Sequence, residues 1–312
     1  MSPAGGRRMR LALLAVAIGT AFAALGAADT IERPIGPPSP PSAAMLRRAV
    51  GDPDPGVLPR LARAVAPRDL VLAMYGGTRA ERLVAIDAAA YLTDPWPVFP
   101  YLAALTAAGE RETASRSAGS LLFALHRAAC GPEGPADVVS GQVAALADQL
   151  AAVAKDVRLE PDLRTSALAA LPLLARVVPF SQPAPIALLE DREAEVRRAA
   201  LGIIGPPVAE AALGALARMA ENDPDPILRG SAAALLCENA LAHGVAALSA
   251  DLHKLVAAVL SNGRTPAAGI APVLVCLARF PSAARADLVD AALKNPDPAL
   301  PAFWDAIADK AP

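Results

Sequence analysis

One predicted amphipathic helix, residues 191–205, constrains the fold more than any other part of the sequence. Its apolar side chains recur at i, i+3, i+4, i+7 and i+8, a stripe wide enough to bury against neighbouring helices. These residues are Val196, Ala199, Ala200, Ile203 and Ile204. Charged residues occupy the first turns, and Gly205 and Pro206 end the helix. The same design recurs elsewhere in the chain, so we interpret this helix as one copy of a repeat.

Helical segments alternate along the whole chain from Ala43 onwards, separated by Pro, Gly and Asp. The second helix of each predicted pair covers 56–66, 78–92, 112–129, 161–177, 193–204, 225–242, 265–279 and 297–310. First helices lie between them, for example at 207–220 and 245–260. About eight pairs of roughly 34 residues each are typical of a helical repeat protein. Strand patterns are scarce, and a chain that is 54% hydrophobic but only 4% aromatic suits many small helix–helix contacts. The sequence therefore predicts an all-α fold.

An arginine near the start of the second helix marks several units: Arg82, Arg116, Arg164, Arg197 and Arg229. In four places an acidic residue precedes an early arginine by six positions: Asp54–Arg60, Glu110–Arg116, Asp191–Arg197 and Asp223–Arg229. The loops repeat as well, as DPDP at 52–55 and 223–226 and NPDP at 295–298. Asp and Asn favour the turn into a helix. We therefore expect Asp223 to cap the following helix and to hold an arginine.

These segments, DREAEVRRAALGIIG and NDPDPILRGSAAALL, resemble HEAT repeats of the short bacterial kind also called PBS-lyase-type HEAT-like repeats. That family carries an Asp in the inter-helix turn and an Arg early in the second helix, which form a ladder between neighbouring units. The resemblance is closest over 183–242, and the later unit PAAGIAPVLVCLARF lacks the early arginine. It implies an α-solenoid of about eight stacked antiparallel helix pairs, a HEAT-like or armadillo-like superhelix over 43–312. Such a fold implies a surface that binds another protein or peptide.

The first 28 residues are typical of an export signal. Three arginines precede the uncharged, Ala-rich stretch 11–28, and small residues occupy the two positions that a signal peptidase reads, so we expect cleavage before Asp29. A Pro-rich linker, 29–42, follows. The sequence thus predicts a periplasmic or secreted protein. The alternative is an uncleaved helix that anchors a structural module to the inner membrane.

The sequence contains no recognisable catalytic or cofactor-binding pattern. His126 and Cys130 are four residues apart, but no second pair of ligands lies near them in sequence, and structural zinc takes four ligands. The net charge of −2, without a basic stripe, argues against a nucleic-acid partner. We predict a protein-binding scaffold of the cell envelope that is not an enzyme and uses no cofactor or metal. The family resemblance leaves open a lyase-associated protein that handles a tetrapyrrole or another small molecule.

The three cysteines are Cys130, Cys237 and Cys276. Packed helix axes lie about 8–10 Å apart, whereas a disulfide needs Cα atoms within about 7 Å. We therefore expect three thiols, buried as small apolar side chains, and no Cys237–Cys276 bridge.

Aromatic residues gather around the turn DPWPVFPY. The candidate partner-binding residues are Tyr91, Trp96, Phe99 and Tyr101, because Trp and Tyr dominate the energetics of many protein interfaces. The competing interpretation, which the usual role of large apolar residues favours, is that they fill the local core.

Overall fold

The computed structural model of the protein describes residues 34–108, 110–130, 140–177 and 185–308. This described part contains fifteen α-helices, one short 3-10 helix and no strand, so the predicted all-α fold class is confirmed. The predicted export signal and the first residues of the predicted linker lie outside it. Helix α2 (Pro40–Ala49) begins inside the predicted linker, because proline suits the first turn of a helix, where its missing N–H is not needed.

The chain divides into two compact units, Met1–Gln182 and Pro183–Pro312, and a helix lies at each predicted second-helix position. In the first unit these second helices are α3 (Val57–Ala64), α5 (Arg79–Ala89), α7 (Arg111–Cys130) and α9 (Pro161–Val177). Their first helices are α2, α4 (Pro67–Gly76), α6 (Phe99–Ala108) and α8 (Ser140–Lys155). In the second unit the second helices are α10 (Ala194–Ile203), α12 (Pro226–Ala242), α14 (Ala267–Ala278) and α16 (Ala299–Ala308). Their first elements are the 3-10 helix η1 (Ile186–Glu190), α11 (Glu210–Asn222), α13 (Ala250–Ser261) and α15 (Ser282–Leu293).

Several helix starts follow from side chains that satisfy the free N–H groups of the first turn. At the start of α5, Thr78 accepts from the Glu81 N–H, while the Glu81 carboxylate accepts from the Thr78 N–H at 2.9 Å. This reciprocal arrangement is a capping box. The hydrogen bonds from Thr78 hold the pKa of Glu81 below its ordinary value. At the start of α13, Ser249 accepts from the Leu252 N–H.

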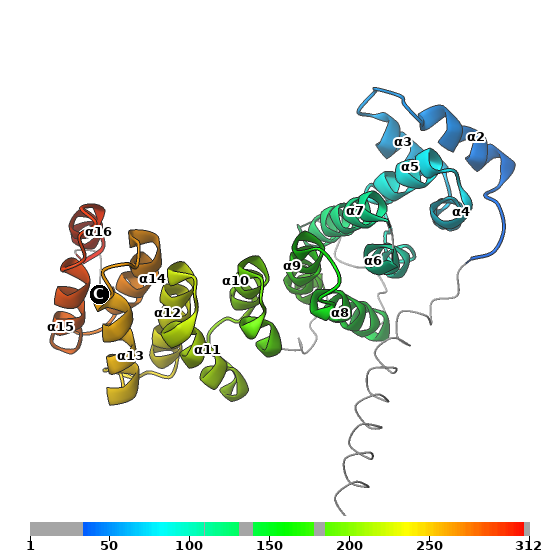
Figure 1. The fold of residues 1–312 in the computed structure, drawn as a ribbon. Coiled ribbons are helices and arrows are strands. Elements are labelled where there is room, and N and C mark those ends of the chain that lie inside the picture. Colours follow the sequence, from blue (N-terminus) through cyan, green and yellow to red (C-terminus); the bar gives the residue numbers. More distant parts are fainter. Residues whose placement is uncertain (1–33, 109, 131–139, 178–184, 309–312) are drawn as a thin grey trace, which may run out of the picture. The chain divides into compact units, whose positions relative to one another are not determined.

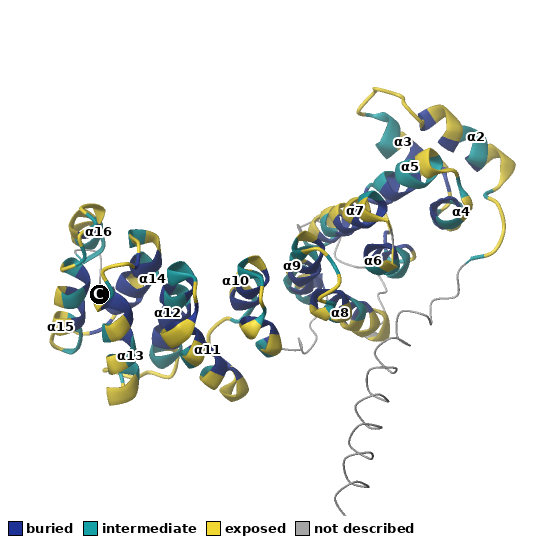
Figure 2. Ribbon diagram, in the orientation of Figure 1, coloured by how far each residue is buried: buried dark blue, intermediate teal, exposed yellow. Residues whose placement is uncertain are grey.

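In the first unit, each second helix packs against the next one: α3 against α5, α5 against α7, and α7 against α9 (Figure 1). On the other side, α6 packs against α8. The apolar faces meet between these helices, where Ile86, Leu125 and Leu168 of the second helices and Leu102 and Leu150 of the first helices are buried. Figure 2 shows this burial along the inward faces, with exposed residues on the opposite faces. The amphipathic pattern of the sequence therefore produces two contacting layers of helices.

The second unit repeats this arrangement. The second helices α10, α12, α14 and α16 contact one another in succession, and so do η1, α11, α13 and α15. Val196, Leu228 and Leu274 on the first set, together with Leu216 and Val256 on the second, are buried between the layers. Burying one Leu or Val side chain contributes about 1.5–3 kcal/mol. Packing between neighbouring pairs therefore stabilises helices that are too short to be stable alone.

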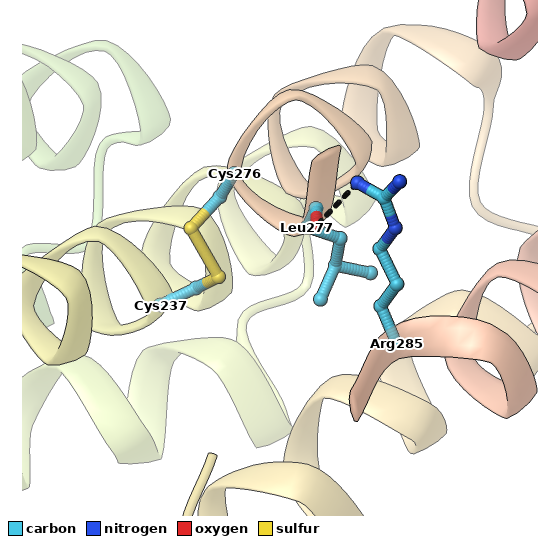
Figure 3. Close-up of a disulfide and its surroundings, with 4 residues drawn as sticks. All are labelled: Cys237, Cys276, Leu277 and Arg285. Atoms are coloured by element: carbon cyan, nitrogen blue, oxygen red, sulfur yellow. Dashed lines mark hydrogen bonds between the residues drawn. A yellow bond between two sulfur atoms is a disulfide. The ribbon is translucent and has the colours of Figure 1, made fainter. Parts of the chain in front are cut away.

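The prediction that Cys237 and Cys276 are thiols is wrong. The structure joins them in a disulfide between α12 and α14, with a Cα–Cα distance of 6.3 Å and no exposed surface on either residue (Figure 3). The two helices lie closer together than the sequence analysis expected, because two glycines face each other between them. A Cβ atom on Gly230 of α12 would overlap the backbone of Gly269 in α14, so these helices approach more closely than side chains normally permit. On its other side α14 is joined to α15, since Arg285 of α15 donates to the Leu277 carbonyl of α14 at 3.3 Å.

Among the described residues, no helix combines the length and the apolar character that crossing a bilayer requires.

Candidate functional site

Most of the turns that lead into the second helices share one construction. A side-chain oxygen of Asp or Asn accepts a hydrogen bond from the backbone N–H two residues later, at 2.8–3.2 Å. Before second helices this bond is made by Asp52, Asp156, Asp191, Asp223, Asn262 and Asn295, and Asp94 makes it before the first helix α6. Such Asx turns hold the chain in the direction that the next helix needs. The repeated D/N signal in the sequence therefore corresponds to a repeated physical joint.

The DPDP and NPDP loops form two such turns in succession. Asp52 accepts from the Asp54 N–H and Asp54 from the Gly56 N–H, at 3.0 and 2.8 Å. Asp223 with Asp225, and Asn295 with Asp297, repeat this arrangement. The N-cap of α12 is accordingly Asp225, not Asp223 as expected from the sequence, while Asp223 lies two residues earlier as the C-cap of α11.

The central ion pair of the second unit joins consecutive helix pairs. Arg197 of α10 donates through Nε and one terminal nitrogen to the two carboxylate oxygens of Asp223, at 2.7 and 2.9 Å. Both side chains are buried, with 7% and 3% of their surface exposed. The third nitrogen donates to the Asp191 carbonyl at 2.8 Å. The hydrogen bond with Asp223 raises the pKa of Arg197, so the guanidinium stays charged in its buried position.

The spacing of six between acid and arginine corresponds to more than one contact. Arg229 donates to the backbone carbonyl of Asp223 at 2.6 Å, as Arg197 does to that of Asp191. Arg60 instead pairs with the Asp54 carboxylate at 2.6 Å, where both side chains are exposed.

The remaining early arginines depart further from the expected pattern. Arg116 pairs with Asp87 of α5 and with Glu112 of its own helix, and not with Glu110. Burial outweighs the neighbouring Arg116 charge and raises the pKa of Asp87. Arg164 is buried at the start of α9, and its Nε donates to the Ala154 carbonyl of α8 at 2.9 Å.

The four aromatic candidates lie in different surroundings. Phe99 is fully buried at the start of α6, and the Trp96 ring packs against it edge-on at 5.0 Å between centroids. Tyr101 is half-buried and meets the Tyr75 ring at 6.1 Å. Tyr91 is also half-buried and lies two residues after the end of α5. Trp96, Tyr91 and Tyr101 thus retain exposed surface, whereas Phe99 belongs to the core.

One exposed aromatic residue was not among the candidates predicted from the sequence. Phe123 of α7 is 46% exposed, and its ring lies 5.4 Å from that of Tyr91. Arg127, one helical turn further along α7, donates to the Ala90 carbonyl at 2.9 Å beside Tyr91. We call Tyr91, Phe123 and Arg127 the aromatic patch. Its signal in the sequence is an apolar ring at a position where the α7 pattern calls for a polar residue.

Two shallow hollows accompany these features. One, of about 630 Å3, is lined by charged residues at the starts of α5 and α7, including Arg79, Arg111 and Glu112. The other, of about 420 Å3, crosses α10, α12 and α14, with Leu201, Ile204 and Leu235 in its lining. The described residues contain no group of three or more His, Cys, Asp or Glu side chains that could hold a metal ion.

Comparisons with protein families, with curated proteins and with solved structures found no match to this chain. The class that the structure defines is therefore an all-α protein built from successive helix pairs with repeated Asx turns.

Proposed function

We propose that this protein is a non-enzymatic scaffold of the cell envelope, an α-solenoid of HEAT-like helix pairs that binds another protein. The arrangement that supports the solenoid is the succession of contacts between second helices within each unit. The buried Arg197–Asp223 pair and the repeated Asx turns support the resemblance to HEAT-like repeats, because both occur at the Asp and Arg positions of that family's motif.

The observation that carries the binding function is the aromatic patch. Tyr, Phe and Arg are enriched at protein interfaces, and Tyr and Arg are frequent among the residues that contribute most to binding. Phe123 exposes 46% of its surface although a ring of its size favours burial, and Arg127 is held beside it by its bond to Ala90. A partner that covers the patch would bury both rings and the apolar part of Arg127.

Export is supported by the Cys237–Cys276 disulfide, because disulfides persist in oxidising compartments such as the bacterial periplasm. The mass of the mature N-terminus tests this part of the proposal. A chain that starts at Asp29 agrees with an exported, untethered protein, whereas an intact N-terminus favours the membrane-tethered alternative.

The binding surface is tested by site-specific crosslinking. A photoreactive phenylalanine analogue at position 123 should capture a discrete partner from the periplasmic fraction. The same analogue at Val157, which is 56% exposed in the same unit, is the matched control. Phe123→Ala should weaken the captured complex by about tenfold or more. Equal crosslinking at both positions, or capture that Phe123→Ala leaves unchanged, would contradict the assignment of the patch.

A further inference from the structure

The turn before α14 shares the first Asx turn of the α12 turn, but with an amide in place of a carboxylate. Three residue pairs relate the two turns and helices, namely Asp223 and Asn262, Gly230 and Gly269, and Cys237 and Cys276, each separated by 39 residues. The last two pairs are in direct contact between α12 and α14. Asn262 therefore occupies the structural position of Asp223.

The amide at position 262 affects the arginine of the preceding helix pair. Arg197 binds the Asp223 carboxylate of the next turn, so the residue that corresponds to Asp223 for Arg229 is Asn262. Arg229 already repeats the other Arg197 contact, since it donates to the backbone carbonyl of the turn residue six positions before it. Within the described part of the chain, however, Arg229 forms no ion pair. An amide has one acceptor oxygen and no negative charge, and the oxygen of Asn262 already accepts from the Arg264 N–H.

The following turn shows how the chain accommodates Asn when no arginine faces it. Position 268, which corresponds to Arg229, is alanine, and the next turn residue is Asn295. The Asn295 amide nitrogen donates to the Thr265 carbonyl at 3.0 Å. At Asn295 the amide nitrogen is therefore a useful donor.

Asn262 is also followed by glycine, on the exposed turn between α13 and α14. We propose that Asn262 is a site of spontaneous deamidation, and that its aspartate product supplies the carboxylate missing opposite Arg229. The Gly263 backbone nitrogen attacks the Asn262 side-chain carbonyl carbon, a five-membered imide forms, and the side-chain nitrogen leaves as ammonia. Water then opens the ring at either carbonyl and gives aspartate or isoaspartate. No oxidant or reductant is needed.

Two features of this turn favour the ring closure. The Arg264 N–H donates to the side-chain oxygen of Asn262 at 3.1 Å, which polarises the carbonyl that is attacked and stabilises the developing negative charge. Glycine at 263 leaves the attacking backbone unhindered and free to adopt the required dihedral angles. Asn295 has the same hydrogen bond but is followed by proline, whose nitrogen carries no hydrogen to lose. Asn295 is thus an internal control within the same protein.

The modification is tested by peptide mapping of the full, folded protein during storage in mildly alkaline buffer. Asn262 should convert to the heavier acid, while Asn295 stays intact. A Cβ atom at Gly263 would meet no other atom within 4 Å, so Gly263→Ala should leave the fold unchanged. This variant should convert about fivefold more slowly, because alanine restricts the attacking backbone. Intact Asn262 in the folded protein, alongside conversion in a denatured sample, would overturn the proposal, since the turn would then protect the amide.

The consequence for Arg229 is tested separately with Asn262→Asp, which is the aspartate product. This variant should raise the denaturant midpoint of the second unit, and the gain should disappear when Arg229 is replaced by methionine. A gain that persists without the arginine, or no gain at all, would overturn the pairing with Arg229.

Discussion

Gly230 and Gly269 face each other so closely that a methyl group on Gly230 would overlap the backbone of Gly269, including its carbonyl oxygen. The Cys237–Cys276 disulfide lies two helical turns further along the same pair of helices. The close approach at the glycines brings the cysteine Cα atoms within bridging distance, as disulfide geometry requires. The interface between α12 and α14 thus depends on two small residues at one end and on a covalent link at the other.

Gly230→Ala should therefore destabilise the second unit. The added methyl group meets rigid backbone, so the helices must separate, and overpacking of this kind costs about 1–3 kcal/mol. Denaturant unfolding measures the loss. Gly202→Ala in α10 is the control, because a Cβ atom there meets nothing within 4 Å. It should be neutral or stabilising by up to about 1 kcal/mol. Equal losses for both variants would mean that the glycine contact is not tight.

The disulfide makes its own contribution to stability. It closes a loop of 39 residues, for which the entropy of the unfolded chain predicts about 4 kcal/mol. Reduction, or replacement of both cysteines by alanine, should lower the unfolding midpoint of the second unit and leave that of the first unit unchanged. Peptide mapping without reduction checks the bridge directly. We expect the mass of the peptide that contains Cys237 linked to the peptide that contains Cys276. Free thiols at both positions would contradict the bridge.

The buried Arg197–Asp223 pair predicts a large effect from a single substitution. Asp223→Ala leaves the guanidinium buried and without its carboxylate, which costs about 3 kcal/mol or more. Asp251 lies exposed in the first turn of α13. Asp251→Ala should cost about 0.5 kcal/mol or less, as surface substitutions usually do. Denaturant unfolding of the two variants compares them. Small and equal effects would show that the pair does not join the two helix pairs.

The first unit should lose stability in acid partly through Asp69. Hydrogen bonds from the Ser39 and Ser42 hydroxyls, both at 2.6 Å, hold the pKa of Asp69 below its ordinary value and tie the start of α2 to α4. A lowered pKa in the folded state means that the contribution is present above the unfolded pKa of about 3.9 and is lost as pH falls through the folded pKa. Asp69→Asn should therefore reduce the unfolding free energy at neutral pH, and the difference from the parent should vanish in acid.

Asp87 provides the opposite sign in the same unit. Burial raises its pKa, so the parent protein loses stability as pH rises from the unfolded pKa through the higher folded value. Asp87→Asn should remove this loss. Parallel pH profiles for the Asp69 and Asp87 variants would contradict both assignments.

Much of the fold could be predicted because the signals are local. The helix periods, the early arginines and the D/N turns each involve residues a few positions apart, and the predicted ranges of α9 and α12 agree with the observed ones within one residue. The disulfide could not be predicted, because it depends on the separation of two helices that only the Gly230–Gly269 contact sets.

The candidate site was less accessible from sequence. Spacing identified Arg197 and Asp223 as ladder residues, but it could not show that Arg197 binds the Asp223 carboxylate of the next turn in addition to the Asp191 carbonyl of its own. Phe123 was missed since its exposure depends on which face of α7 the neighbouring helices leave uncovered. Contacts between helices depend on how the helices pack in the tertiary structure, whereas the periodicity of the sequence describes one helix at a time.

The Asx turns have a consequence for how such a chain can lengthen. Each Asx turn is formed by atoms of residues two positions apart, so a copied segment that contains these residues can form the same turn. The stretch from Asp191 to Asn222 begins at one joint and ends immediately before the next. A tandem duplication of that stretch would bring its own joint and its own Arg197, and it would present an aspartate to the arginine before it. Duplication of a whole unit therefore reproduces the Asx turn and the arginine–aspartate contact together. Chains of this kind can lengthen by one helix pair at a time, without a new hydrophobic core.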